Sequence, residues 1–177
     1  MTQSGDMYQF TLRAGEGQGE RIEGTVKPSG EIKVSKREPS FNTCPICLAR
    51  GTLIDTPNGL VPVEQLRSGM TVWTIDVSGK RVPAVVVETT MTPVPASFQV
   101  TRVTLRDGRI VATSLGHPTA EGRPLGDYQV GDTLDGATVI SVEHLAYDGA
   151  TYDLLPSGRT GFYWANGILL KSTLTTH

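Results

Sequence analysis

The stretch that decides the fold runs from residue 47 to residue 59 and reads Cys47-Leu48-Ala49-Arg50-Gly51-Thr52-Leu53-Ile54-Asp55-Thr56-Pro57-Asn58-Gly59. Its centre, residues 52–55, predicts a short strand, because apolar and β-branched residues stand there between turn formers. A cysteine heads the stretch, and the chain has two cysteines, Cys44 and Cys47. Both belong to one Cys-Pro-Ile-Cys motif, so no framework of long-range disulfides is available. A hydrophobic core must hold the fold together.

A faint internal repeat extends outward from this stretch. Residues 62–72 (Pro-Val-Glu-Gln-Leu-Arg-Ser-Gly-Met-Thr-Val) align without gaps onto residues 124–134 (Pro-Leu-Gly-Asp-Tyr-Gln-Val-Gly-Asp-Thr-Leu). Extended backwards at the same offset, residues 51–57 fall on residues 113–119, so each copy would enter through a strand-and-turn segment. Because apolar positions keep their register along the unbroken offset, we predict two related β-units.

The rest of the chain also has the pattern of β-strands. It contains 20 glycines and 11 prolines between short runs rich in Val, Ile and Thr, which is typical of an all-β fold. Further strands are predicted at residues 71–75, 82–90, 100–105, 110–113, 138–145, 151–155 and 161–164. The one predicted helical turn is Val63-Glu64-Gln65-Leu66, which follows Pro62 and ends before Gly69. Residues 8–12, 22–26 and 31–35 predict an appended hairpin with a third strand.

Composition limits the classes of function. The 177 residues suffice for one domain with a core and an appendage. The formal net charge of -2, without a block of like charge, disfavours binding to nucleic acid or to an anionic membrane. No apolar run approaches the roughly 20 residues of a membrane span, and the N-terminus lacks a signal-peptide pattern. We therefore expect the chain as given to be soluble, and its localisation stays open.

No metal or cofactor is expected. A single Cys-x-x-Cys motif is half of a four-cysteine zinc site, and the histidines do not follow it at the spacing of a zinc finger. The chain has three histidines, His117, His144 and His177. His144, in a predicted strand, and His177, at the terminus, are interpreted as structural or solvated.

Three ordered blocks resemble the Hint family, the self-processing fold shared by inteins and hedgehog proteins. Residues 47–59 and 63–72 resemble its opening block, which begins with a cysteine, and residues 108–118 resemble its second block, whose signature is Thr-x-x-His. Residues 151–154 and 162–170 resemble its last block. The resemblance covers about residues 47–173 and is of the bacterial intein-like kind. It implies an all-β horseshoe of two pseudo-symmetric units, within a larger protein that could be secreted or on a bacterial cell surface.

The same resemblance implies a division of the chain and a chemistry for its first residues. Residues 1–46 become an N-terminal β extension and extein-like segment, residues 47–173 the Hint domain, and residues 174–177 a tail. The thiol of Cys47 would attack the carbonyl of Ile46 and convert the Ile46–Cys47 peptide bond into a thioester. His117 is the implied acid/base, since imidazole titrates near neutrality. The implied hydroxyl is Ser114 by the spacing of the family block or Thr113 by residue type, and both alternatives stay open.

The end of the resembling region departs from the intein pattern. Asp153 matches the acid of the last block, where it would orient water or modulate the thiol. Inteins then finish on His-Asn, whereas this chain has Lys171-Ser172 in that register. Serine has no side-chain amide nitrogen for cyclisation, and lysine is a poor neutral acid/base. Thr173, next along the chain, could at most receive an acyl group. The resemblance therefore implies an N-to-S acyl shift without C-terminal asparagine cyclisation and without full splicing.

Two classes of function follow. In the first, the domain is a single-turnover self-processing protein whose substrate is its own N-terminal segment, and water, a thiol or an amine acts as the external nucleophile. In the second, it is a catalytically silent Hint scaffold that serves as a structural or interaction module of a larger protein. Cys44 adds a hypothesis of redox gating, because a disulfide to Cys47 would block the nucleophile until it is reduced. Tyr163 and Trp164 are interpreted as core aromatics.

Overall fold

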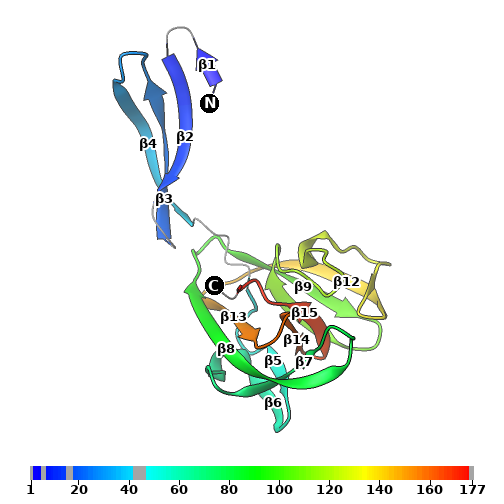
Figure 1. Cartoon of the computed structure of the whole chain (residues 1–177). Coiled ribbons are helices and arrows are strands. Elements are labelled where there is room, and N and C mark those ends of the chain that lie inside the picture. Colours follow the sequence, from blue (N-terminus) through cyan, green and yellow to red (C-terminus); the bar gives the residue numbers. More distant parts are fainter. Residues whose placement is uncertain (1, 5–6, 15–17, 42–46, 176–177) are drawn as a thin grey trace. The chain divides into compact units, whose positions relative to one another are not determined.

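The computed structural model describes residues 2–4, 7–14, 18–41 and 47–175. The chain forms two compact units, Met1–Cys44 and Pro45–His177. The first unit is an antiparallel sheet in the order β1 (Thr2–Ser4), β2 (Met7–Ala14), β3 (Gln18–Val26) and β4 (Ile32–Phe41) (Figure 1). It contains the three strands predicted for the extension, each longer than predicted, and β1 in addition.

The second unit is almost entirely β-structure, which confirms the predicted fold class. Its strands form three sheets, in the orders β10-β9-β12-β11, β13-β8-β7 and β15-β14-β5-β6. The predicted helical turn is present as a 3-10 turn, η1, and a second such turn, η2, occurs later in the chain. The elements are β5 (Leu53–Thr56), β6 (Gly59–Pro62), η1 (Val63–Gln65), β7 (Thr71–Ile75), β8 (Arg81–Pro93), β9 (Gln99–Leu105), β10 (Ile110–Ser114), η2 (Leu125–Asp127), β11 (Thr133–Leu134), β12 (Ala137–Ala146), β13 (Ala150–Pro156), β14 (Phe162–Ala165) and β15 (Ile168–Lys171).

The internal repeat is a structural repeat. The turns η1 and η2 lie 62 residues apart, and each follows a proline of nearly the same backbone conformation. Each turn ends at an extended residue, Leu66 or Tyr128. Three residues later, Gly69 and Gly131 adopt φ values of 90° and 98°. That left-handed region is open to glycine at little cost, which explains why both copies keep it. Residues 62–72 and 124–134 therefore match position by position.

The backward extension of the repeat at the same offset is wrong by three residues. The carbonyl of Leu53 accepts a hydrogen bond from Asn166, and its counterpart in the second copy is the carbonyl of Pro118, which accepts from Lys171. The hairpin that follows is shorter in the second copy, where Thr119 bonds to Arg123. In the first copy the equivalent pairing spans residues 54 to 61. Before the hairpin the true offset is thus 65, and a sequence comparison without gaps cannot show the deletion.

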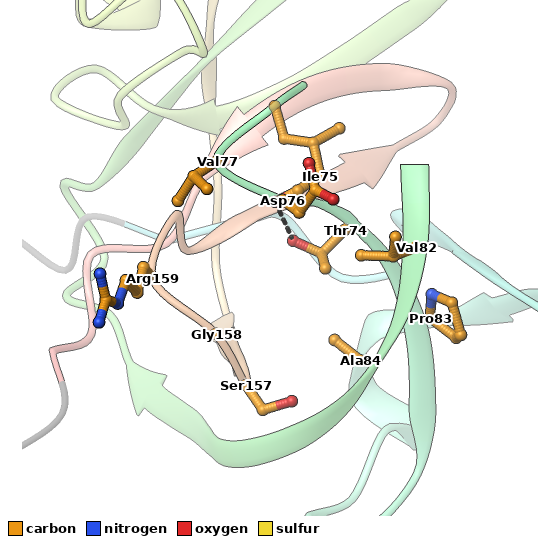
Figure 2. A pocket seen from close by; sticks show the side chains of 10 residues that line it. All are labelled: Thr74, Ile75, Asp76, Val77, Val82, Pro83, Ala84, Ser157, Gly158 and Arg159. Atoms are coloured by element: carbon orange, nitrogen blue, oxygen red, sulfur yellow. Dashed lines mark hydrogen bonds between the residues drawn. The ribbon is translucent and has the colours of Figure 1, made fainter. Parts of the chain in front are cut away.

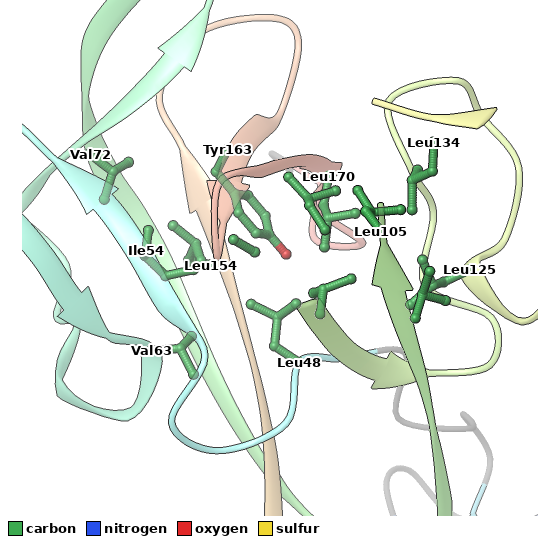
Figure 3. Close-up of a cluster of buried hydrophobic side chains, with 14 of the residues drawn as sticks. Leu48, Ile54, Val63, Val72, Leu105, Leu125, Leu134, Leu154, Tyr163 and Leu170 are labelled. Carbon is green, nitrogen blue, oxygen red and sulfur yellow. The ribbon is translucent and has the colours of Figure 1, made fainter. Parts of the chain in front are cut away.

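The two halves exchange strands. β9 follows the first half along the chain but pairs with β12 of the second, and β13 follows the second half but pairs with β8 of the first. Neither half can therefore bury its apolar surface alone. A large apolar cluster results, with Leu48, Ile54, Leu105, Leu154 and Tyr163 fully buried in it (Figure 3). Burial of each such leucine or isoleucine stabilises the fold by about 1.5–3 kcal/mol.

Candidate active site around Cys47

Cys47 heads a short segment that is held between two strands. Leu48 forms bridges to Thr113 at the end of β10 and to Tyr152 of β13. The N–H of Leu48 donates to the carbonyl of Tyr152 at 2.7 Å, and the N–H of Tyr152 donates back at 3.0 Å. Because the Leu48 side chain is also fully buried, the backbone beside Cys47 has a fixed position.

The amide nitrogen of Cys47 is the nitrogen of the predicted scissile bond. Its N–H donates to the hydroxyl oxygen of Ser114 at 2.9 Å, and the N–H of Ser114 donates to the Cys47 carbonyl at 2.9 Å. The hydroxyl of Thr113 points elsewhere and donates to the Ser114 carbonyl at 2.8 Å. Of the two candidates, the geometry brings Ser114 to Cys47. Ile46 and Cys44, the predicted acyl donor and redox partner, lie outside the described residues.

The Cys47 side chain is a free and buried thiol. Burial, followed by the negative charge of Asp153, raises the pKa of the thiol from 9.0 to about 12, whereas hydrogen bonds with Thr151 and Thr90 act to lower that pKa. Thr90 of β8 stands directly opposite Asp153 of β13, and Thr151 is two residues from Asp153 on the same face. The thiol thus lies against a polar face of the β8–β13 pair.

His117 follows Ser114 in a tight turn. Its backbone N–H donates to the Ser114 carbonyl at 3.1 Å, and its carbonyl accepts the N–H of Leu125 at the start of η2. In the first half of the domain, the equivalent bond runs from Val63 to Thr52. His117 therefore occupies the place that Thr52 has in the other copy, and it is fully buried.

A chain of hydrogen bonds leads from His117 to Asp153. The Nε2 atom of His117 lies 3.1 Å from the Tyr163 hydroxyl, which donates to Oδ1 of Asp153 at 2.9 Å. Tyr163 is fully buried in the core (Figure 3). Burial, and then the charge of Asp153, raises the pKa of Tyr163 well above its usual value of 10. The tyrosine therefore stays protonated and serves as a fixed hydroxyl.

Asp153 accepts hydrogen bonds from β13, from β14 and from the segment after β15. Besides Tyr163, its carboxylate accepts the N–H of Leu154 at 2.8 Å, the N–H of Thr173 at 2.8 Å and the Thr173 hydroxyl at 2.7 Å. Four donors on one buried carboxyl group match the acceptor-only character of an ionised carboxylate. Asp153 thus connects the surroundings of Cys47 with the segment that follows β15.

Lys171 and Ser172 stand apart from these contacts. Lys171 is the last residue of β15, and its ammonium lies 5.9 Å from the ring centre of Phe162 in β14. The N–H of Ser172 donates to the Gly161 carbonyl at 2.8 Å, and the Ser172 hydroxyl accepts the N–H of Leu174 at 3.0 Å. These bonds anchor the chain after β15 and give neither side chain a contact with the thiol.

The sequence missed three residues of this site. Tyr163 was interpreted as a core aromatic, and it is one, but its hydroxyl also joins His117 to Asp153. Thr90 was predicted only as a strand residue, and Thr151 as a strand residue within the last resembling block, without a role in the site. A buried tyrosine needs a partner for its hydroxyl, which is a signal that could have drawn attention to Tyr163. The two threonines carry no such signal, since threonine is common in strands.

Other features of the described residues do not point to a cofactor or metal. No group of three or more His, Cys, Asp or Glu side chains stands at metal-binding distance within the part of the chain that the structure describes. None of the described helices is long and apolar enough to span a membrane. A separate pocket of about 360 Å³ opens between β7, β8 and residues 157–159 (Figure 2). No predicted site residue lines it.

Comparison with known proteins relates part of the chain to one family. Residues 46–120 match the model of the Hint domain. This part of the chain is similar to a Hint domain. The match begins one residue before Cys47 and ends three residues after His117, so it includes the first two of the blocks that were predicted from the sequence. No curated protein matches the chain.

Solved structures show that the Hint fold continues beyond the matched residues. A DnaB intein from Synechocystis sp. PCC 6803 has a TM-score of 0.63 at 18% identity, covering 72% of this chain and 99% of its own. A bacterial intein-like domain from Clostridium thermocellum has a TM-score of 0.62 at 22% identity, with coverage of 72% and 99%. A variant of the Ssp DnaB mini-intein gives 0.63 at 17% identity, with coverage of 73% and 95%. At these identities the likeness establishes the fold.

Proposed function

We propose that the domain activates the Ile46–Cys47 peptide bond by an N-to-S acyl shift and stops short of splicing. The Hint fold supports an autoprocessing or splicing-type role in general. The observation that carries the more specific proposal is the hydrogen bond from the Cys47 N–H to the Ser114 hydroxyl, 2.9 Å long and buried. It holds the nitrogen that must leave, which belongs to the same residue as the thiol that would attack.

The proposed step is balanced within the chain. The sulfur of Cys47 bonds to the carbonyl carbon of Ile46, and the carbon–nitrogen bond between the two residues breaks. The thiol loses its proton and the departing nitrogen gains one, so that a peptide and a thiol become a thioester and an amine. A later attack by water, a thiol or an amine on the thioester releases residues 1–46 and restores the Cys47 thiol.

Each neighbouring group has a place in this step. Ser114 fixes the plane of the peptide through the Cys47 N–H, so that the bond presents the same face to the sulfur throughout. His117 is the proton carrier, since its imidazole can take up the thiol proton and deliver one to the departing nitrogen near neutral pH. Asp153 opposes ionisation of the thiol before the reaction. Because it is linked to His117 through the Tyr163 hydroxyl, its negative charge would favour positive charge on the imidazole during the reaction.

The raised pKa of Cys47 predicts a slow reaction. With a thiol pKa of about 12, the thiolate makes up roughly one part in 10⁵ at pH 7. The hydrogen bonds with Thr151 and Thr90 offset part of that penalty, because they stabilise the charged sulfur. We therefore expect cleavage over hours to days, faster at higher pH and in the presence of an added thiol.

Nothing in the proposed reaction uses the C-terminal end of the domain. Ser172 cannot cyclise, and its hydroxyl is engaged by the N–H of Leu174. The partners proposed are accordingly the chain's own N-terminal segment and a small external nucleophile. Neither nucleic acid nor a membrane has a role.

One observation favours the silent scaffold as a second candidate. A thiol that is buried and has a raised pKa is also what an inert structural cysteine presents. The two candidates differ in whether the Ile46–Cys47 bond ever becomes susceptible to a nucleophile.

The experiment that separates them is incubation of the purified full chain with dithiothreitol at pH 8, followed by intact mass analysis over several days. The active domain releases residues 1–46, and the variant Cys47→Ala does not. The control is Thr113→Val, which leaves the Cys47 thiol and the Ser114 hydroxyl in place. An absence of cleavage in the folded wild-type chain under all these conditions would select the scaffold.

A further inference from the structure

Tyr163 is a fully buried titratable group that the proposed reaction does not use. Its hydroxyl stands between the imidazole of His117 and the carboxylate of Asp153, at 3.1 Å and 2.9 Å. The titratable groups around it are these two, from the turn after β10 and from β13, and the Cys47 thiol. A hydroxyl in this position has one proton to donate, and this proton settles the direction of both bonds.

The direction follows from Asp153. Its carboxylate accepts from Tyr163, Leu154 and Thr173, so the Tyr163 proton points to Asp153. The Tyr163 oxygen can then only accept from His117, which requires a hydrogen on Nε2 of the imidazole. In the neutral ring the other nitrogen, Nδ1, carries the lone pair.

We propose that Tyr163 is a positioning residue that holds His117 in the Nε2–H tautomer and links the charge of its imidazole to Asp153. The inference rests on the proposed function, in which His117 carries the proton. It adds that Nδ1 is the atom through which the proton enters and leaves, because Nε2 keeps its hydrogen in both states of the ring. A buried carboxylate behind a histidine fixes the tautomer and stabilises the imidazolium, and here a tyrosine hydroxyl extends that connection by one bond.

The chain supplies a matched control. Tyr128 is also buried, and its hydroxyl bonds to Thr119 at 3.1 Å and to Glu121 at 3.4 Å. Tyr128→Phe therefore removes a buried tyrosine hydroxyl from the same domain without touching the path from His117 to Asp153. Any effect that Tyr163→Phe has and Tyr128→Phe lacks belongs to that path.

The test reads the tautomer directly by nitrogen-15 NMR of the full chain labelled at histidine, with His117→Gln to assign the signals. In the wild-type chain we expect the Nε2–H form of neutral His117. Tyr163→Phe should give a mixture of both tautomers and a lower pH midpoint for His117, whereas Tyr128→Phe should change neither. A wild-type Nδ1–H form would overturn the inference, and so would a Tyr163→Phe spectrum equal to that of the wild type. The wild-type measurement needs no variant to fold.

Cleavage gives the second reading. In the dithiothreitol assay, Tyr163→Phe should cleave about 10- to 100-fold more slowly, with its rate-against-pH profile displaced with the His117 midpoint. A profile of unchanged shape and rate would overturn the inference. If no form of the chain cleaves while the wild-type tautomer is Nε2–H, the proposed function fails and the assignment of the tautomer stands, so that the two failures are distinguishable.

Discussion

Replacing Ser114 by alanine tests the contact on which the proposed function depends most. The variant removes the acceptor of the Cys47 N–H and leaves that donor buried beside a side chain of similar size. An unsatisfied buried donor costs about 1–3 kcal/mol. If the contact is stronger in the transition state than in the unreacted chain by the same amount, its loss corresponds to a decrease of about 5- to 150-fold in the rate of cleavage.

The assay is release of residues 1–46 in dithiothreitol, measured for Ser114→Ala and for Thr113→Val. The Thr113 hydroxyl donates to a backbone carbonyl and not to Cys47, so its loss should reduce the free energy of unfolding by about 0.5–1.5 kcal/mol and leave the rate unchanged. Equal rates for the two variants, or a slower Thr113→Val, would refute the assignment of the hydroxyl to Ser114. Urea unfolding of both variants shows that the comparison is made on folded protein.

Three further predictions concern pH, the Asp153 carboxylate and the surface. Because the pKa of the Cys47 thiol is raised from 9.0 to about 12 in the folded chain, stability that is present below pH 9 is lost between pH 9 and pH 12. Urea unfolding at pH 8 and pH 10 should show that the wild-type chain loses about 1.4 kcal/mol more than Cys47→Ala, and equal losses would contradict the burial of the thiol. Thr173→Val removes one donor from Asp153 and should lower the free energy of unfolding by about 0.5–1.5 kcal/mol without slowing dithiothreitol cleavage; a slower reaction would give Thr173 a role that the proposal denies. The Arg81 guanidinium lies 4.9 Å from the ring centre of Trp73 and 4.6 Å from that of Trp164. Arg81→Ala should therefore lower the free energy of unfolding in urea by about 1–2 kcal/mol, and an unchanged midpoint would exclude a contribution from these cation–π contacts.

Much of the fold could be predicted because its signals are local. The glycines that end each hairpin and the Val/Ile/Thr runs between them gave strands that agree with the structure to within a few residues. The repeat at residues 62–72 and 124–134 was visible because both copies keep a proline before the 3-10 turn and a glycine after it. The three-residue deletion in the second hairpin was not visible, since it lies before these matching positions and changes only the pairing partners.

The candidate site was predictable where one residue type carries the chemistry. Cys47 and His117 stand out because a thiol and an imidazole are rare in this chain. The choice between Thr113 and Ser114 could not be made from the sequence, because it depends on which of two adjacent side chains faces Cys47 across a strand. The place of Tyr163 in the site could not be predicted for a related reason. An aromatic residue in an apolar strand predicts the core, and only the pairing of β14 with its neighbours brings the hydroxyl to Asp153.

The most direct test of the central claim is the chemical identity of the product formed with hydroxylamine. A thioester at Cys47 reacts with hydroxylamine to give a hydroxamate on the Ile46 carbonyl and a free Cys47 thiol, whereas an ordinary peptide bond does not react under the same mild conditions. Mass analysis of the released fragment should find residues 1–46 ending in that hydroxamate, from the wild-type chain and not from Cys47→Ala. An intact wild-type chain, or a fragment that forms equally in Cys47→Ala, would contradict the account.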